Sequence, residues 1–334
     1  MIKAFWFNNR LEASSILQPE FFTPKTHFRV HAALPNATAP AEVTVSAICN
    51  GIAAFENTYT VEELGPGGAI DLRKPADTLV SDPERLDIKI LTGGKSYTES
   101  IRCEYAVISG KVTDFDGAPF PAAVIFNMDS FEGFENGLGV WSDRDGNYSI
   151  RLPKGEYNSV YVDDNSYGKT SLEAWCWKMI IDRDESHDFK IGNGEVYSMD
   201  VWANNGGPPS LFVYFRPMVL SYTVQAMALE NKPQITVSGK QYSLLELSPD
   251  IDMESVSAEI NGRKVANISL QKIYETPPEG DALPAYILQC ERPPGTGKQT
   301  MVLEYNFKDS KGDKAQSQGR TQFHYTNMLG LAVR

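Results

Sequence analysis

Residues 107–162 read VISGKVTDFDGAPFPAAVIFNMDSFEGFENGLGVWSDRDGNYSIRLPKGEYNSVYV, and this stretch decides how the middle of the chain folds. Short runs of alternating apolar and polar residues are separated by turn residues, which is typical of β-strands joined by tight connections. Asp145-Gly146 lies between two such runs and predicts a hairpin, because glycine accepts the positive φ angle of the turn. We expect Tyr148 and Tyr157, on either side of a second turn, to fill the core.

The order of these turns and strands resembles the carboxypeptidase regulatory-like domain, a transthyretin-like β-sandwich. The matching motifs are Gly110-Lys111-Val112, Asp116-Gly117-x-Pro119, Asp143-x-Asp145-Gly146-x-Tyr148 and Leu152-Pro153-x-Gly155-x-Tyr157. The resemblance implies a non-catalytic module that stands beside other domains, often on secreted or surface proteins. It covers residues 106–206, which we predict to form the middle domain.

The flanking regions show the same rhythm of short strands and turns. About 100 residues of such strands is the size of an immunoglobulin-like sandwich. We therefore predict an all-β chain of three consecutive β-sandwich domains: immunoglobulin-like over residues 1–105, carboxypeptidase-regulatory-like over 106–206, and immunoglobulin-like over 207–334. The strand prediction includes Tyr197–Trp202 in the middle domain and Ser221–Ala228 in the third. No helix longer than two turns is expected.

The chain has 334 residues and a formal charge of −12, and residues 107–206 alone carry −9. A negative field repels polyanions, so nucleic acid is not an expected partner. The acidity of the middle region indicates a solvated surface or one that attracts cations. No apolar run is long enough for a membrane span. The N-terminus lacks the apolar core of a signal peptide, which favours the cytoplasm, whereas the family resemblance favours the cell surface or secretion.

Two of the four cysteines, Cys49 and Cys103, lie on the apolar side of alternating runs in the first domain. Both thiols are therefore expected to point into its core. They would either pair across the sandwich or stay as buried free thiols, and the second interpretation is favoured in a chain without a signal peptide.

Four of the five tryptophans are candidates for ligand binding: Trp141, Trp175, Trp177 and Trp202. Trp175 and Trp177 are two residues apart on one predicted strand, so they project from the same side. A pair of indoles on a sheet can stack on sugar rings, which makes a glycan a possible partner beside another protein. The alternative is that these rings pack the core or the seam between domains.

Four aspartates of the middle domain, Asp114, Asp116, Asp143 and Asp145, are candidates for a metal site. They lie in two turns, and oxygen-rich turns can bind calcium. The alternative is that each aspartate accepts hydrogen bonds from its own turn. Apart from calcium, no cofactor is expected.

Catalytic motifs of the related families are absent from the sequence. Hydroxyisourate hydrolases share the transthyretin-like fold but need several matched histidines, and the middle domain has only His187. No histidine is followed by glutamate in the His-x-x-Glu pattern of zinc carboxypeptidases. We therefore predict a non-catalytic binding or structural protein. The rival is a carbohydrate-active enzyme with a site at a domain seam, built from paired carboxylates such as those near Asp163 and Asp182.

Overall fold

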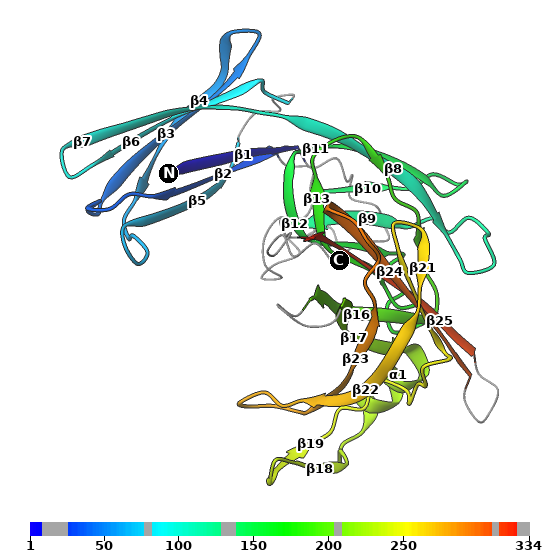
Figure 1. The fold of residues 1–334 in the computed structure, drawn as a ribbon. Coiled ribbons are helices and arrows are strands. Elements are labelled where there is room, and N and C mark those ends of the chain that lie inside the picture. Colours follow the sequence, from blue (N-terminus) through cyan, green and yellow to red (C-terminus); the bar gives the residue numbers. More distant parts are fainter. Residues whose placement is uncertain (9–25, 77–81, 128–137, 204–208, 309–313, 326–334) are drawn as a thin grey trace, which may run out of the picture.

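The computed structural model describes residues 1–8, 26–76, 82–127, 138–203, 209–308 and 314–325 of the chain (Figure 1). In these ranges the chain folds into twenty-five β-strands and one α-helix, so the all-β prediction is confirmed. Pairs of sheets enclose three hydrophobic cores that follow one another along the chain. The molecule is therefore a series of β-sandwiches.

The first core lies between a sheet of order β1-β2-β5 and a sheet of order β4-β3-β6-β7. Alternation along β3 sends Val43, Val45 and Ala47 into this core, where they meet Trp6 and Phe28 from the opposite sheet. The strands are β1 (Ile2–Asn8), β2 (Thr26–Ala33), β3 (Ala41–Cys49), β4 (Ile52–Val61), β5 (Ala69–Pro75), β6 (Arg85–Thr92) and β7 (Lys95–Arg102).

The second core lies between β11-β8-β14, with β15 also paired to β8, and the strands β10-β9-β12-β13. Gly146 has a φ of 82°, as the predicted hairpin requires. Tyr148 and Tyr157 are buried, and their hydroxyls donate to the carbonyls of His187 (2.6 Å) and Pro153 (2.8 Å). The strands are β8 (Tyr105–Thr113), β9 (Ala123–Asn127), β10 (Leu138–Trp141), β11 (Asn147–Pro153), β12 (Gly155–Asp163), β13 (Ala174–Ile181), β14 (Glu185–Ser186) and β15 (Phe189–Lys190).

The third core lies between β16-β17-β23-β22 and the strands β25-β24-β20-β21. A separate hairpin, β18-β19, projects from this part at the far end from β1 (Figure 1). The elements are β16 (Gly194–Trp202), β17 (Ser210–Val219), α1 (Leu220–Ala228), β18 (Gln234–Val237), β19 (Lys240–Ser243), β20 (Val256–Ile260), β21 (Arg263–Val265), β22 (Asn267–Glu275), β23 (Leu283–Glu291), β24 (Gly297–Lys308) and β25 (Lys314–Tyr325).

One sheet runs through both the second and the third sandwich. β13 pairs in parallel with β25, with Trp175 opposite Gly319 and Trp177 opposite Thr321. The result is an eight-stranded sheet of order β10-β9-β12-β13-β25-β24-β20-β21. Main-chain hydrogen bonds between two strands that lie far apart in the sequence therefore connect the second and third cores.

One strand prediction was wrong, and a second predicted strand belongs to another sheet than expected. Ser221–Ala228 belongs to the helix α1, because its alanine, methionine and glutamine favour a helix and its buried residues are Thr223 and Ala226. Tyr197–Trp202 lies in β16, which pairs with β17 in the third sandwich instead of completing the second. The domain boundaries themselves stay predictions.

The first sandwich is attached to the second through a short connection between β7 and β8. Arg151 forms an ion pair with Asp82 (2.8 Å between Nε and Oδ2), and the Tyr105 hydroxyl donates to the carbonyl of Pro83 (3.2 Å). Phe5 of β1 packs against the second core. These contacts join the first two sandwiches at their seam.

Cys49 and Cys103 lie in the same sheet instead of facing sheets. Ile48 pairs with Arg85, and Arg85 pairs with Arg102, so Cys49 at the end of β3 and Cys103 directly after β7 are separated by β6. Two strand spacings put their Cα atoms about 10 Å apart, beyond the reach of a disulfide. Pairing across the sandwich is therefore wrong, and neither cysteine forms a disulfide. Burial raises the pKa of Cys103 to about 11.

Candidate functional site

The sequence-predicted tryptophans are placed around the junction of β13 with β16. The rings of Trp175 and Trp177 stack on each other, with centroids 4.6 Å apart and planes 9° apart. Tyr197 of β16 packs edge-on against both rings, at 5.4 Å and 5.2 Å. Tyr161 stacks on the other side of Trp175 at 5.1 Å. We call Tyr161, Trp175, Trp177 and Tyr197 the seam cluster.

The seam cluster leaves little aromatic surface for a ligand. Trp175 is only 1% exposed, so neither of its faces is accessible to a sugar ring. Trp141 packs against the cluster from β10 and is partly buried. Trp202 is separate from the cluster: it is 38% exposed and stacks on Phe212 at 5.8 Å. Ligand binding by the four tryptophans stays a prediction, and the structure brings three of them together.

Two buried glutamates lie beside the seam cluster, and the sequence analysis missed both. Glu195 of β16 is 1% exposed, and its Oε2 accepts a hydrogen bond from the backbone N–H of Glu173 (3.0 Å). Burial raises the pKa of Glu195 to about 8. Burial, and then repulsion by Glu195, raises the pKa of Glu173 to about 9. Both carboxyls are therefore protonated near neutral pH and can donate hydrogen bonds.

Asp163 lies near Glu173 and Glu195, whereas Asp182 does not. Burial raises the pKa of Asp163, and its charge acts on both Glu173 and Glu195. The antiparallel register of β12 with β13 pairs Val162 with Ala174 at one end and Gly155 with Ile181 at the other, so Asp163 and Asp182 lie past opposite ends of the ladder. The two aspartates are therefore about 25–30 Å apart, and they cannot act as the paired carboxylates of a glycosidase.

Asp182 lies in a second polar cluster at the far end of β13. The Lys298 ammonium of β24 contacts Asp182 (2.7 Å) and Glu185 (2.5 Å) and donates to the carbonyl of Ile180 (3.0 Å). His187 contacts Glu185 through Nε2 (3.1 Å) and Arg320 through Nδ1 (3.2 Å). These contacts connect β24 and β25 to the second sandwich.

The charge state of His187 follows from these neighbours. Burial and the Arg320 guanidinium lower its pKa to about 4, so the imidazole is neutral at physiological pH. The guanidinium can only donate, so Nδ1 accepts and Nε2–H donates to Glu185. This arrangement gives His187 a structural role in the junction.

The aspartates predicted to bind calcium stabilise their own turns. Oδ1 of Asp114 accepts from the N–H groups of Asp116 (3.0 Å) and Ala118 (2.8 Å). Oδ1 of Asp143 accepts from the N–H groups of Asp145 (2.9 Å) and Asn147 (2.8 Å), which lowers its pKa. The described residues include no group of three or more acidic, histidine or cysteine side chains arranged to hold a metal ion. Calcium binding stays a prediction.

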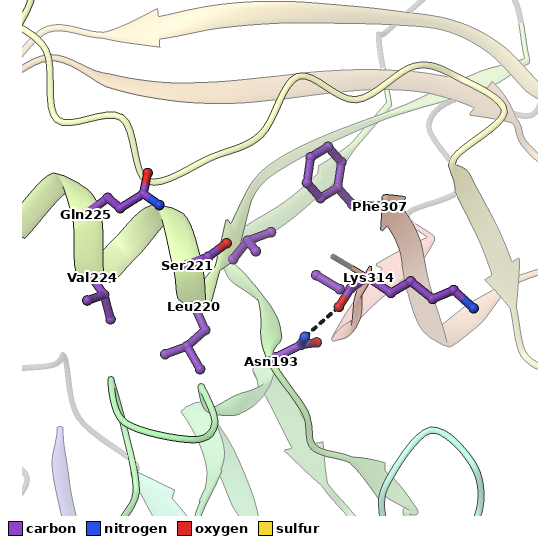
Figure 2. A pocket seen from close by; sticks show the side chains of 9 residues that line it. Asn193, Leu220, Ser221, Val224, Gln225, Phe307 and Lys314 are labelled. Carbon is purple, nitrogen blue, oxygen red and sulfur yellow. Dashed lines mark hydrogen bonds between the residues drawn. The ribbon is translucent and has the colours of Figure 1, made fainter. Parts of the chain in front are cut away.

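A hollow of about 380 Å³ lies beside the first turn of α1 (Figure 2). Leu220, Val224 and Phe307 give it apolar walls, and Asn193 donates to the carbonyl of Lys314 at its edge (2.5 Å). The size is that of a small-molecule site.

No helix in the described part of the chain is long and apolar enough to span a membrane.

Comparison with known proteins gives no family. No protein-family model matches the chain, and no curated protein sequence does. A structure of BcpA, the major pilin subunit of Bacillus cereus, aligns at 10% identity over 66% of this chain and 69% of that chain, with a TM-score of 0.22. The group B streptococcus pilus 2b backbone protein aligns at 12% identity over 57% and 92%, with a TM-score of 0.20. The Bacillus anthracis TIE protein aligns at 9% identity over 97% and 72%, with a TM-score of 0.20. TM-scores this low assign no role, and the class remains that of an all-β protein of serial sandwiches.

Proposed function

We propose that this chain is a non-catalytic structural module that acts through protein or glycan contacts. The observation that carries the proposal is the parallel pairing of β13 with β25, which runs one sheet through two sandwiches. A continuous sheet resists bending and pulling better than two sandwiches on a linker, because main-chain hydrogen bonds must break for the parts to separate.

Side chains at both ends of β13 support a rigid junction. The seam cluster packs β16 against one end of β13, and Lys298 contacts the second sandwich at the other. Arg320, opposite Cys176 on the neighbouring strand, donates to the carbonyl of Asp188. At the other seam, Arg151 and Phe5 attach the first sandwich to the second. The chain would therefore form a stiff body, and its outer surfaces would be available for contacts with partners.

The finer assignment of the sandwiches belongs to the same proposal. We propose a carboxypeptidase regulatory-like domain in the middle, flanked by immunoglobulin-like domains. The positive φ of Gly146 and the buried rings of Tyr148 and Tyr157 support it, because the motif residues have the roles in turns and core that the resemblance implies.

One observation favours the rival, a carbohydrate-active enzyme. Glu173 and Glu195 are neighbouring carboxyls with raised pKa values beside an indole, and perturbed carboxyls gather at catalytic sites. The site would lie at a domain seam, as the rival requires.

Single-molecule pulling between the chain ends tests the structural proposal. We expect the second and third sandwiches to unfold as one unit. Independent low-force unfolding of the two sandwiches in the wild type would overturn the proposal. A glycoside-hydrolysis screen is the second arm: turnover that Glu195→Gln abolishes would establish the rival.

A further inference from the structure

We propose that Asn50 is a site of spontaneous deamidation, at which the Asn50-Gly51 pair closes to a succinimide and reopens as aspartate or isoaspartate. The product would place a new negative charge in the turn between β3 and β4. The inference goes beyond the proposed function, because it concerns a covalent change of the chain itself.

Three Asn-Gly pairs lie in the described part of the chain: Asn50-Gly51, Asn193-Gly194 and Asn261-Gly262. Glycine has no side chain to obstruct the approach of its backbone nitrogen to the amide carbon of the preceding asparagine, so this kind of pair closes most readily. The asparagine side chain must also be able to rotate toward that nitrogen. The hydrogen bonds of each asparagine therefore decide which pair reacts first.

Two of the three asparagine side chains are held in place. Asn261 donates through Nδ2 to Oε1 of Gln299 (2.7 Å) and accepts through Oδ1 from the N–H of Thr300 (2.8 Å). Asn193 donates through Nδ2 to the carbonyl of Lys314 (2.5 Å). Both side chains have to lose these bonds before a ring can close.

The Asn50 side chain is not held in this way. It is exposed, and it makes no hydrogen bond to any residue that the structure describes. Gly51 has a φ of 74°, and a Cβ atom on it would meet nothing within 4 Å, so there is open space around the ring that would form. Of the three asparagines, Asn50 is therefore the one that can react without first breaking a side-chain bond.

The reaction balances with water as the only co-reactant. The Gly51 nitrogen attacks Cγ of Asn50, so that a bond forms between these two atoms and the bond from Cγ to Nδ2 breaks. Nδ2 leaves as ammonia with the proton that the Gly51 nitrogen gives up. Water then adds to either carbonyl of the cyclic imide, which opens to the carboxylate of aspartate or isoaspartate and releases a proton.

A contact of Gly51 slows this reaction. Oε1 of Glu84 accepts a hydrogen bond from the Gly51 N–H (2.8 Å) and so holds the peptide plane between Asn50 and Gly51, which has to rotate for the attack. A charged acceptor makes a stronger hydrogen bond than a neutral one. Glu84 is therefore a brake on the reaction, and its removal should speed the conversion of Asn50.

The product would disturb a region that is already acidic. After burial, the charges of Glu84 and Asp82 are the causes that raise the pKa of the Cys49 thiol, so both carboxylates lie near the residue that precedes Asn50. Asp82 also forms the ion pair with Arg151 that joins the first two sandwiches. A further carboxylate at position 50 would repel both acids, and isoaspartate would lengthen the backbone of the turn by one methylene. We therefore expect the product to be less stable.

Prolonged incubation of the full chain at mildly alkaline pH, followed by peptide mass spectrometry, tests the inference. We expect isoaspartate to form at Asn50 about ten times faster than at Asn193 or Asn261, because these two must first lose side-chain hydrogen bonds. The same chain in denaturant is the control, since all three sites should then convert at similar rates. Faster conversion of Asn193 or Asn261 in the folded chain, or no conversion of Asn50, would overturn the inference.

Variants test the brake and the effect of the product separately. Glu84→Ala should speed the conversion of Asn50 several-fold, and a slower conversion would contradict the role given to Glu84. Asn50→Asp carries the added charge without the reaction and should lower the melting temperature. Asn50→Gln is the matched control, because it is neutral and closes a ring far more slowly. Equal melting of these two variants would contradict the expected effect of the new carboxylate.

Discussion

Trp175 of β13 lies opposite Gly319 of β25 in a parallel register, and β16 crosses the sheet directly above this pair. A Cβ atom on Gly319 would lie 2.4 Å from Cγ1 of Val196 on β16, far inside van der Waals contact. The missing side chain therefore allows the two facing sheets of the third sandwich to approach each other at this point. The close contact at Gly319 brings the eight-stranded sheet next to β16, the strand that carries Tyr197 of the seam cluster.

Gly319→Ala should destabilise the third sandwich, in which Gly319 and Val196 face each other. The methyl group would push Val196 and β16 outward, and overpacking of this kind costs about 1–3 kcal/mol. Urea unfolding at pH 7 measures the change. Gly295→Ala is the matched control, because its nearest neighbour lies 3.4 Å away, and its effect should stay within about 0.5 kcal/mol. Equal stability of the two variants would show that β16 can move freely.

Glu195→Gln should stabilise the protein at alkaline pH. Above its usual pKa of 4.5 a glutamate loses its proton in the unfolded state, but Glu195 keeps it in the native state up to a pKa of about 8. Stability therefore falls as pH rises through this window, by up to about 1.4 kcal/mol per pH unit for each such group. Glutamine has no proton to lose, so the variant should have a shallower decline.

Denaturant unfolding at a series of pH values from 6.5 to 9 measures this effect. His187 acts in the opposite direction only at lower pH, because its pKa is about 4 in the native state and 6.5 when unperturbed. Glu173, with a pKa of about 9, leaves a residual slope in the variant. The exposed Glu156→Gln on β12 is the control. Parallel pH profiles for wild type and Glu195→Gln would contradict the buried, protonated state of Glu195.

The elements that could be predicted from sequence are those with local signals. The hairpin at Gly146 depends on one residue's φ angle, and Tyr148 and Tyr157 follow alternation along their strands. The pairing of Trp175 with Gly319 has no such signal, because 144 residues separate the two partners. Neither β13 nor β25 has a sequence pattern that specifies which strand it pairs with. The helix α1 was missed because its short apolar pattern also fits a strand.

The site was predictable only in part, for a related reason. Alternation was enough to place Trp175 and Trp177 on one side of a strand, and the structure stacks them. What covers them is Tyr197, from a strand that the sequence analysis placed in the middle sandwich and that the structure pairs with β17 of the third. Glu195 could be suspected only as a charged residue next to apolar neighbours in β16, a pattern that surface strands share.

Tryptophan fluorescence should separate the exposed and buried indoles. Acrylamide should quench Trp202, which is 38% exposed, but not Trp175, which is 1% exposed. Trp202→Phe should therefore remove most of the quenchable signal, and Trp175→Phe should leave it unchanged. The same signal tests glycan binding across a glycan panel. A spectral shift that Trp202→Phe or Trp177→Phe abolishes would support the prediction, and indifference to every glycan would end it.

Thermal melting with added calcium or with a chelator tests the remaining prediction, the metal site of the acidic turns. Binding to the native state raises the melting temperature, so a calcium site at these turns predicts a rise that Asp145→Asn removes. Asp143→Ala acts differently, because Asp143 accepts hydrogen bonds from the N–H groups of Asp145 and Asn147. It should lower the melting temperature even in the presence of chelator. If calcium leaves the wild type unchanged while Asp143→Ala melts earlier, these aspartates serve turn geometry alone.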